Sequence, residues 1–162
     1  LLMFSSASGD EIDFRTPTLY TRWGAASYLP YNGTTSASFM AGGATPSTVA
    51  NVEEYNGSSW TTVTAVPVTI KGHSSAGTQT DGLIFAGTQA GSTSGTTLGY
   101  DGTNWSTRPS LSTARKQGAG FVTATASAAT QFGGSPNNTG GTATEDFTGE
   151  TETPNIETFS TS

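Results

Sequence analysis

The sequence predicts an all-β protein built from repeated units, and composition gives the first reason. The chain of 162 residues contains 31 Thr, 20 Ser and 21 Gly. Threonine favours the pleated, half-exposed surface of a strand, and glycine supplies tight turns. Charged residues make up only 11% of the chain, whereas 10% are aromatic and regularly spaced. A disordered chain is usually rich in charge and poor in aromatic residues, so this composition favours a folded β protein.

A repeat of about 45 residues is the second reason. The stretch EEYNGSSW (53–60) recurs as LGYDGTNW (98–105), so that its Tyr and its Trp each recur after 45 residues. A glycine that follows a hydrophobic stretch recurs as Gly42, Gly87 and Gly133. A period of about 40 to 50 residues is typical of propeller blades or a similar β array. The sequence therefore predicts three units, at approximately 19–65, 66–110 and 111–162, preceded by a segment 1–18 that is a connector, an interface arm or the end of a preceding unit.

The second unit shows the strands that each unit should contain. Four strands are expected there, in HSSAGTQT (73–80), GLIFAGT (82–88), TTLGY (96–100) and NWSTR (104–108). A hairpin should join the last two, because Asn-Gly and Asp-Gly pairs adopt positive φ readily, and the units place Asn56-Gly57 and Asp101-Gly102 there. No helix is expected: ATASAA (124–129) has helical composition but occupies a strand position of the third unit.

The start of each unit has its own pattern, a basic residue followed by small residues. Arg22, Lys71 and Arg115 hold this position in the three units. These few cations are scattered, and the net charge of −6 argues against nucleic acid as a partner.

Several other classes of protein are also disfavoured. The chain has no cysteine, which excludes disulfides and thiolate metal sites and leaves the compartment undecided. No apolar run approaches the roughly 20 residues of a membrane-spanning helix, and LLMF at the start is too short for a signal peptide. The first residue is not Met, which is compatible with a processed or internal piece. No glycine-rich stretch has the Lys of a phosphate-binding loop, and no cofactor is expected.

Four stretches together resemble a known group of repeats. They are NVEEYNGSSW, LSTAR, SAGTQTDGLIFAGT and TATEDFTGETETPNIETFSTS, and they span most of residues 19–162. In combination they are similar to kelch-like repeats in virion and tail proteins of marine tailed bacteriophages, including those that infect cyanobacteria. Here the Tyr and Trp are only five positions apart, AGT replaces the Gly pair of the second unit, and Phe147 has no following Trp.

The resemblance implies kelch-like β-propeller blades in a non-enzymatic virion protein. A tail fibre or another exposed appendage is the implied place, with a role in host attachment, particle assembly or both. Copies of the chain, other virion proteins and a host surface glycan are the implied partners, without membrane insertion. Three units are fewer than the roughly four to eight blades that close a propeller, so oligomerisation or missing sequence is expected to complete the array.

Aromatic residues are the first candidates for sites. Tyr55, Trp60, Tyr100, Trp105 and Phe147 recur with the repeat and are expected to be structural, although carbohydrate-stacking platforms are the alternative. A second group, Trp23, Tyr28 and Tyr31, breaks the repeat beside LPYNG (29–33). Loop aromatics outside the repeat suit ligand binding or packing at an oligomer interface.

Polar candidates have plain structural alternatives. The single histidine, His73, has Ser74 and Ser75 beside it, but sequence neighbours rarely form a catalytic triad, and a solvent-facing or turn position is expected. Calcium needs about six to eight oxygen ligands, so a solvated turn is preferred for the acidic cluster near the N-terminus. The paired acids of the first and third units are expected to protect strand edges rather than to act as glycosidase carboxylates. These acidic residues are Asp10, Glu11 and Asp13, then Glu53 with Glu54 and Glu145 with Asp146. Asn32, Asn56 and Asn104 match the N-glycosylation pattern, which chance produces readily in a chain so rich in Thr and Ser.

Other functions remain open on the sequence alone. A capsid decoration or a tail connector needs no ligand. A secreted bacterial lectin-like propeller would bind glycans, and a glycan-cleaving enzyme would need two non-periodic carboxylates across a cleft.

Overall fold

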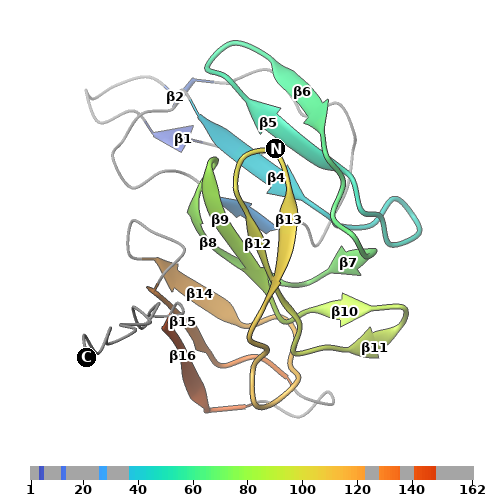
Figure 1. Cartoon of the computed structure of the whole chain (residues 1–162), viewed down its shortest axis with the longest axis vertical. Coiled ribbons are helices and arrows are strands. Elements are labelled where there is room, and N and C mark those ends of the chain that lie inside the picture. Colours follow the sequence, from blue (N-terminus) through green and yellow to red (C-terminus); the bar gives the residue numbers. More distant parts are fainter. Residues whose placement is uncertain are drawn as a thin grey trace, which may run out of the picture.

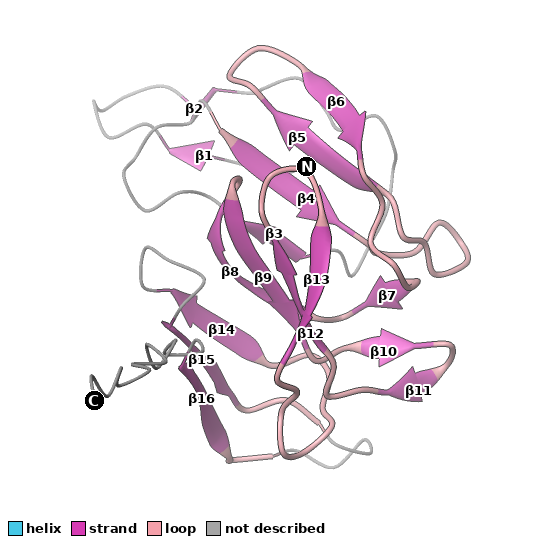
Figure 2. Ribbon diagram, viewed as in Figure 1, coloured by secondary structure: helices cyan, strands magenta, loops and turns pink. Residues whose placement is uncertain are grey.

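The structure is a computed structural model of the whole chain. It describes residues 37–122, 128–135 and 141–148, together with the backbone of three short strands at 4–5, 12–13 and 26–28; the side chains of 121 and 122 are not included. Within these residues every regular element is a β-strand, as the sequence predicts, and every pairing is antiparallel (Figures 1 and 2). No helix in this part of the chain is long and apolar enough to cross a membrane.

Three large sheets that follow one another along the chain dominate the molecule. The first sheet contains β3 (Ala26–Tyr28), β4 (Ser38–Ala41), β5 (Val52–Tyr55) and β6 (Trp60–Val63). The second contains β8 (Ser74–Thr78), β9 (Asp81–Phe85), β12 (Thr97–Tyr100) and β13 (Trp105–Arg108). The third contains β14 (Ala119–Val122), β15 (Ala128–Phe132) and β16 (Thr144–Thr148).

Short strands accompany these sheets. A small sheet of β7 (Ile70–Lys71), β10 (Thr88–Gln89) and β11 (Ser92–Thr93) lies beside the second sheet (Figure 1). A two-stranded pair, β1 (Phe4–Ser5) with β2 (Ile12–Asp13), falls in the expected N-terminal segment, whose other residues are outside the described part of the chain. The first strands of the three large sheets, β3, β8 and β14, lie side by side, and the described strands form no closed ring.

The strand prediction for the second unit is confirmed. The four expected segments contain β8, β9, β12 and β13, paired in that order. In the third unit, β15 begins at Ala128, inside the segment with helical composition, while residues 123–127 fall outside the described ranges.

The two hairpins that carry the Asn-Gly and Asp-Gly pairs are longer than a two-residue turn. Tyr55 pairs with Trp60 across a loop of residues 56–59. The Asn56 side-chain oxygen accepts hydrogen bonds from the backbone N–H groups of Ser58 and Ser59, at 3.0 and 2.9 Å. Gly57 has a φ of 96°, a value that glycine adopts without steric cost. The Asn-Gly pair therefore marks the turn correctly, but the side chain of Asn56 closes it.

A pair of residues with positive φ ends the second strand of each unit. The pairs are Gly42-Gly43, Ala86-Gly87 and Gly133-Gly134, with φ between 62° and 102°. Gly87 therefore corresponds to Gly43 and Gly134, so the expected alignment with Gly42 and Gly133 is wrong by one position. The cause is Ala86, which takes the place of the first glycine in the second unit and adopts the left-handed conformation that glycine holds in the other units.

The same hydrogen bonds correct the alignment of the basic residues. The N–H of Gly43 donates to the carbonyl of Ile70 at 2.8 Å, and that of Gly87 donates to the carbonyl of Arg115 at 2.7 Å. Each glycine thus binds the segment that leads into the next sheet. Arg115 corresponds to Ile70 and not, as expected, to Lys71.

Two joints hold the three sheets together. The first joint, between the first and second sheets, is apolar, and its buried side chains are Phe39, Ala41, Val52, Val66, Ile70, Ile84 and Leu98. The second joint, between the second and third sheets, contains a smaller apolar cluster of Ala76, Leu83, Phe85 and Ala129, with Phe147 packed against it. Removing such side chains from water is the main force that stabilises a fold.

The far face of the third sheet has no following sheet among the described residues. Phe132 on this face is 42% exposed. The residues at the same position of the preceding sheets, Ala41 and Phe85, are 0% and 3% exposed, because the next sheet covers them. The face is therefore of the kind that the repeat normally buries.

Candidate functional site

Four of the repeat aromatics pack in pairs across their hairpins. The ring of Tyr55 is tilted against Trp60 with centroids 5.2 Å apart, and Tyr100 stacks on Trp105 at 4.7 Å. Tyr100 also donates a hydrogen bond to Glu54 of the first sheet, at 2.7 Å. Burial, together with that bond and the charge of Glu54, raises the pKa of Tyr100, so its hydroxyl stays protonated. The bond between Tyr100 and Glu54 joins the first two sheets, whereas each ring pair lies within one sheet.

The expectation of a solvent-facing or turn position for His73 is wrong. Its side chain is only 7% exposed, and neither ring nitrogen has a hydrogen-bond partner in the described part of the chain. The side chain lies between the glycines of two units, since a Cβ on Gly42 would meet its ring carbon Cε1 at 3.0 Å and one on Gly87 would meet its Cβ at 2.8 Å. Desolvation by burial lowers the pKa of His73 to about 4. The neighbouring Ser74 hydroxyl donates instead to the carbonyl of Gly118, so the two do not form a nucleophile and base pair.

The paired acids do more than protect strand edges. Glu53 is fully buried, which contradicts an exposed, solubilising role. Glu54 accepts the hydrogen bond of Tyr100, and Glu145 forms an ion pair with Arg115. Only Asp146, bonded by the hydroxyl of Thr130 at 2.8 Å, keeps the expected exposed position on its strand.

The two joints differ in polarity at matching positions, and this difference defines the candidate site. Strand registers and the glycine hydrogen bonds align the units residue by residue. Four positions that are apolar in the first joint are polar in the second. The first joint has Val52, Ile70, Ile84 and Leu98, and the second has Thr97, Arg115, Gln131 and Glu145 at the same places.

An ion pair forms the centre of the second joint. Arg115, which is 2% exposed, contacts Glu145 at 2.7 Å. Its guanidinium also donates to the carbonyls of Gly133 and Ala143, at 3.1 and 2.9 Å. Arginine presents five donors in a fixed plane, and here they connect the loop before β14 with both ends of the β15–β16 connection.

Glu145 is held on its other side by the same loop. The N–H and the hydroxyl of Ser112 donate to it at 2.6 and 2.8 Å, and the N–H of Thr113 donates at 3.3 Å. Burial alone would raise the pKa of Glu145, but these hydrogen bonds and the charge of Arg115 outweigh it and lower the pKa. The pair therefore stays ionised at neutral pH, and its charges neutralise each other.

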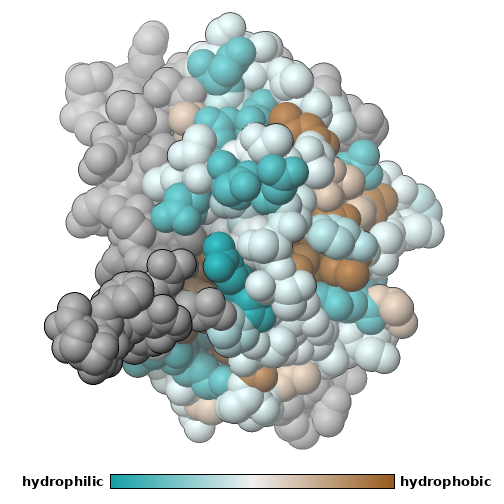
Figure 3. All heavy atoms as spheres, viewed as in Figure 1, coloured by the Kyte–Doolittle hydropathy of each residue, from teal (hydrophilic) through white to brown (hydrophobic). Residues whose placement is uncertain are grey.

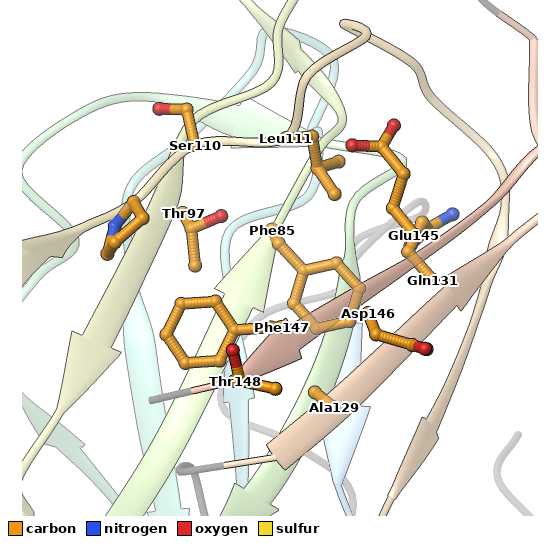
Figure 4. A pocket seen from close by; sticks show the side chains of 11 residues that line it. Phe85, Thr97, Ser110, Leu111, Ala129, Gln131, Glu145, Asp146, Phe147 and Thr148 are labelled. Carbon is orange, nitrogen blue, oxygen red and sulfur yellow. The ribbon is translucent and has the colours of Figure 1, made fainter. Parts of the chain in front are cut away.

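A cavity of about 180 Å³ opens beside this ion pair (Figure 4). Strands of both sheets and the loop after β13 form its walls. Phe85 and Phe147 lie close together within it, and Gln131 and Glu145 lie along one side. The complete lining is Phe85, Thr97, Pro109, Ser110, Leu111, Ala129, Gln131, Glu145, Asp146, Phe147 and Thr148.

Gln131 is the least satisfied polar residue of the cavity wall. It is 1% exposed, and neither its amide nitrogen nor its amide oxygen has a partner among the described residues. Its amide lies against Gly118, the position that His73 holds in the preceding unit. A buried amide without a hydrogen bond costs about 1 to 3 kcal/mol, so an aliphatic residue would be the more stable choice.

The sequence did not reveal this site, because the repeat units were aligned by similar short stretches of sequence rather than by their core positions. Arg115, Gln131 and Glu145 become conspicuous only when the units are aligned by their glycine pairs. The expected ligand residues Trp23, Tyr28 and Tyr31 lie outside the residues whose side chains are described, as do Asp10, Glu11 and Asp13. In the described ranges, no three or more His, Cys, Asp or Glu residues are grouped as a metal site would require.

Comparison with known proteins shows the fold alone. No family model and no curated protein matches the chain. Solved structures do match, in 107 chains, among them the structure of YjhT, with a TM-score of 0.68 and 16% sequence identity. The match covers 88% of this chain and 47% of that one, so this chain spans about half the length of its structural relative.

Proposed function

We propose that this chain is a non-enzymatic structural protein of a phage virion, located in a tail fibre or another exposed appendage. The three large sheets are kelch-like propeller blades in this proposal. Two features support it: the combined phage-like strings in residues 19–162, and consecutive antiparallel sheets that repeat with the same period. Further units, from other copies or from additional sequence, complete the array.

The exposed Phe132 supports this completion. Its position is buried in both preceding sheets, and a large apolar side chain left in water favours association. The structural relative is about twice as long as the matched part of this chain, which gives room for as many units again.

The virion role includes attachment to host surface glycans. The observation that carries this part is the polar second joint, where side chains able to hydrogen-bond replace the Val, Ile and Leu of the first joint. Pale residues of intermediate hydropathy cover much of the described surface, between separate hydrophilic and hydrophobic patches (Figure 3). A surface rich in neutral hydroxyl groups can form weak hydrogen bonds with glycans. Many copies on one particle would strengthen such binding through avidity.

Two experiments test the proposal. Mass spectrometry of purified virions should detect the chain, and immunogold labelling should place it on an appendage. The purified protein should bind intact host cells and lose that binding when surface polysaccharide is removed. A protein that is present in the virion but binds no cells would be a capsid decoration or a tail connector, and a protein found free in a bacterial culture would be a secreted lectin-like propeller.

A further inference from the structure

We propose that the cavity of the second joint binds one neutral sugar residue, in a site between two sheets rather than on the Tyr and Trp residues of the hairpins. This inference rests on the proposed glycan-binding role and names its site and ligand class. The size of the cavity, its charge, its walls and the residues that the repeat would otherwise place there support it.

The size of the cavity limits the ligand to a single ring. Sites for drug-sized molecules usually measure about 300 to 1,000 Å³, and the cavity measures about 180 Å³. An oligosaccharide could therefore place one residue inside, with the others outside. A folded peptide segment would be too large.

The charge of the cavity favours a neutral ligand. Glu145 is neutralised by Arg115, whose guanidinium is already engaged by that carboxylate and by carbonyl groups. The carboxylate of Asp146 bonds Thr130 on the opposite face of the sheet, because neighbouring residues of a strand point to opposite faces and Glu145 and Phe147 face the cavity. A neutral sugar therefore meets no unpaired charge, whereas the carboxylate of a uronic or sialic acid would enter a cavity whose cation is already engaged.

The walls combine apolar and polar groups in the way that a sugar ring requires. Phe85 and Phe147 offer aromatic surface to the C–H face of the ring, and Pro109 and Leu111 add apolar area. Thr97 and Gln131 supply a hydroxyl and an amide on strands of opposite sheets. Rigid strands hold these groups in place, so binding costs little conformational entropy.

The repeat itself supplies the substitutions that test the site. The first unit has Met40 where the third has Gln131, and Val52 where the second has Thr97. Gln131→Met and Thr97→Val therefore install residues that this fold already accepts at those positions. Both variants should melt at the same or a higher temperature than the wild-type protein, because they remove a buried polar group.

The measurement is a titration followed by two-dimensional NMR. The probes are glucose, galactose, mannose and fucose, with glucuronic acid and N-acetylneuraminic acid as anionic comparisons. We expect shifts confined to residues of the second joint, a dissociation constant in the millimolar range for at least one neutral sugar, and weaker binding of both acids. Each variant should weaken that binding by about tenfold or more. Phe132→Ser, which changes the far face of the third sheet, should leave it unchanged.

Three results would overturn the inference: no shifts with any neutral sugar at 50 mM, preferential binding of an acid, or unchanged binding in both variants. Attachment is measured separately, on host cells. If wild-type protein and Gln131→Met bind cells equally, attachment stands and the cavity is not its site. If the cavity binds a sugar but the protein binds no cells and is absent from virions, the proposed function fails and the site remains.

Discussion

Lowering the pH from 7 to 5 is expected to destabilise the protein by about 2 kcal/mol through His73 alone. Burial without a hydrogen-bond partner lowers the pKa of this imidazole to about 4 in the folded protein. In the unfolded chain the pKa returns to about 6.5. The unfolded state therefore takes up the proton first, and folding then costs the removal of that proton or the burial of an imidazolium.

The sign and the size of the effect follow from these two pKa values. Above pH 6.5 both states are neutral and the stabilising contribution is complete. It falls as the pH drops from 6.5 toward 4 and levels off below 4, where both states are charged. The total loss is about 3 kcal/mol, since one pKa unit corresponds to roughly 1.4 kcal/mol.

Urea unfolding followed by tryptophan fluorescence, at pH 7, 6 and 5, measures this loss directly. His73→Gln is the control, because it keeps a polar side chain of similar length that does not titrate. Subtracting its pH dependence removes the contribution of carboxylates such as Glu145, whose lowered pKa confines their effect to more acidic solutions. The reasoning is refuted if the two proteins lose stability in parallel between pH 7 and 5, or if NMR gives His73 a pKa near 6.5 in the folded state.

Three further predictions concern the ion pair, the glycine turns and the open face. Glu145→Gln should lower the free energy of unfolding by about 3 kcal/mol in the urea assay, because Arg115 is left buried without its counter-charge; a loss below 1 kcal/mol would contradict this. Gly87→Ala should lower it by more than about 2 kcal/mol, because the new Cβ would lie 2.8 Å from the Cβ of the buried His73 at a φ of 95°. The matched variant Gly91→Ala has a similar φ but open space around it, and an equal loss would show that sterics play no part. Phe132→Ser should reduce the particle mass measured by light scattering after gel filtration, and an unchanged mass would mean that this face is not an interface.

Local signals made the strands predictable. A hairpin is specified by a few residues, so Asp101-Gly102 between two strand-forming runs was enough to locate β12 and β13. Spacing alone was less reliable, because the loop after the second strand differs in length by one residue between the first two units and the glycine alignment was therefore wrong by one position. The slip was invisible in the sequence, since the left-handed residue there is Ala86 rather than glycine.

The environment of His73 could not be predicted for a related reason. A small polar neighbourhood in the sequence indicates a turn, but the ring occupies space that two glycines of different units leave free. In the third unit the same space is filled by the amide of Gln131, which comes from another strand and lies against Gly118. Such exchanges between distant positions preserve volume without leaving a pattern along the chain.

The contrast between the joints is the strongest reason to look for function in the second one. Both joints share the same strand registers and the same glycine hydrogen bond, so the fold does not require polar residues in either. An apolar version is compatible with this backbone, because the first joint is one. Arg115 and Glu145 satisfy each other and could persist as a structural pair, but Gln131 gains no hydrogen bond from any described residue. A residue that breaks the local rules of a fold and adds no stability is a candidate for a functional role. If Gln131→Met is more stable and loses sugar binding, the unpaired amide is kept for binding at a cost in stability. If the variant is more stable and binds sugar as before, the amide has no role in binding.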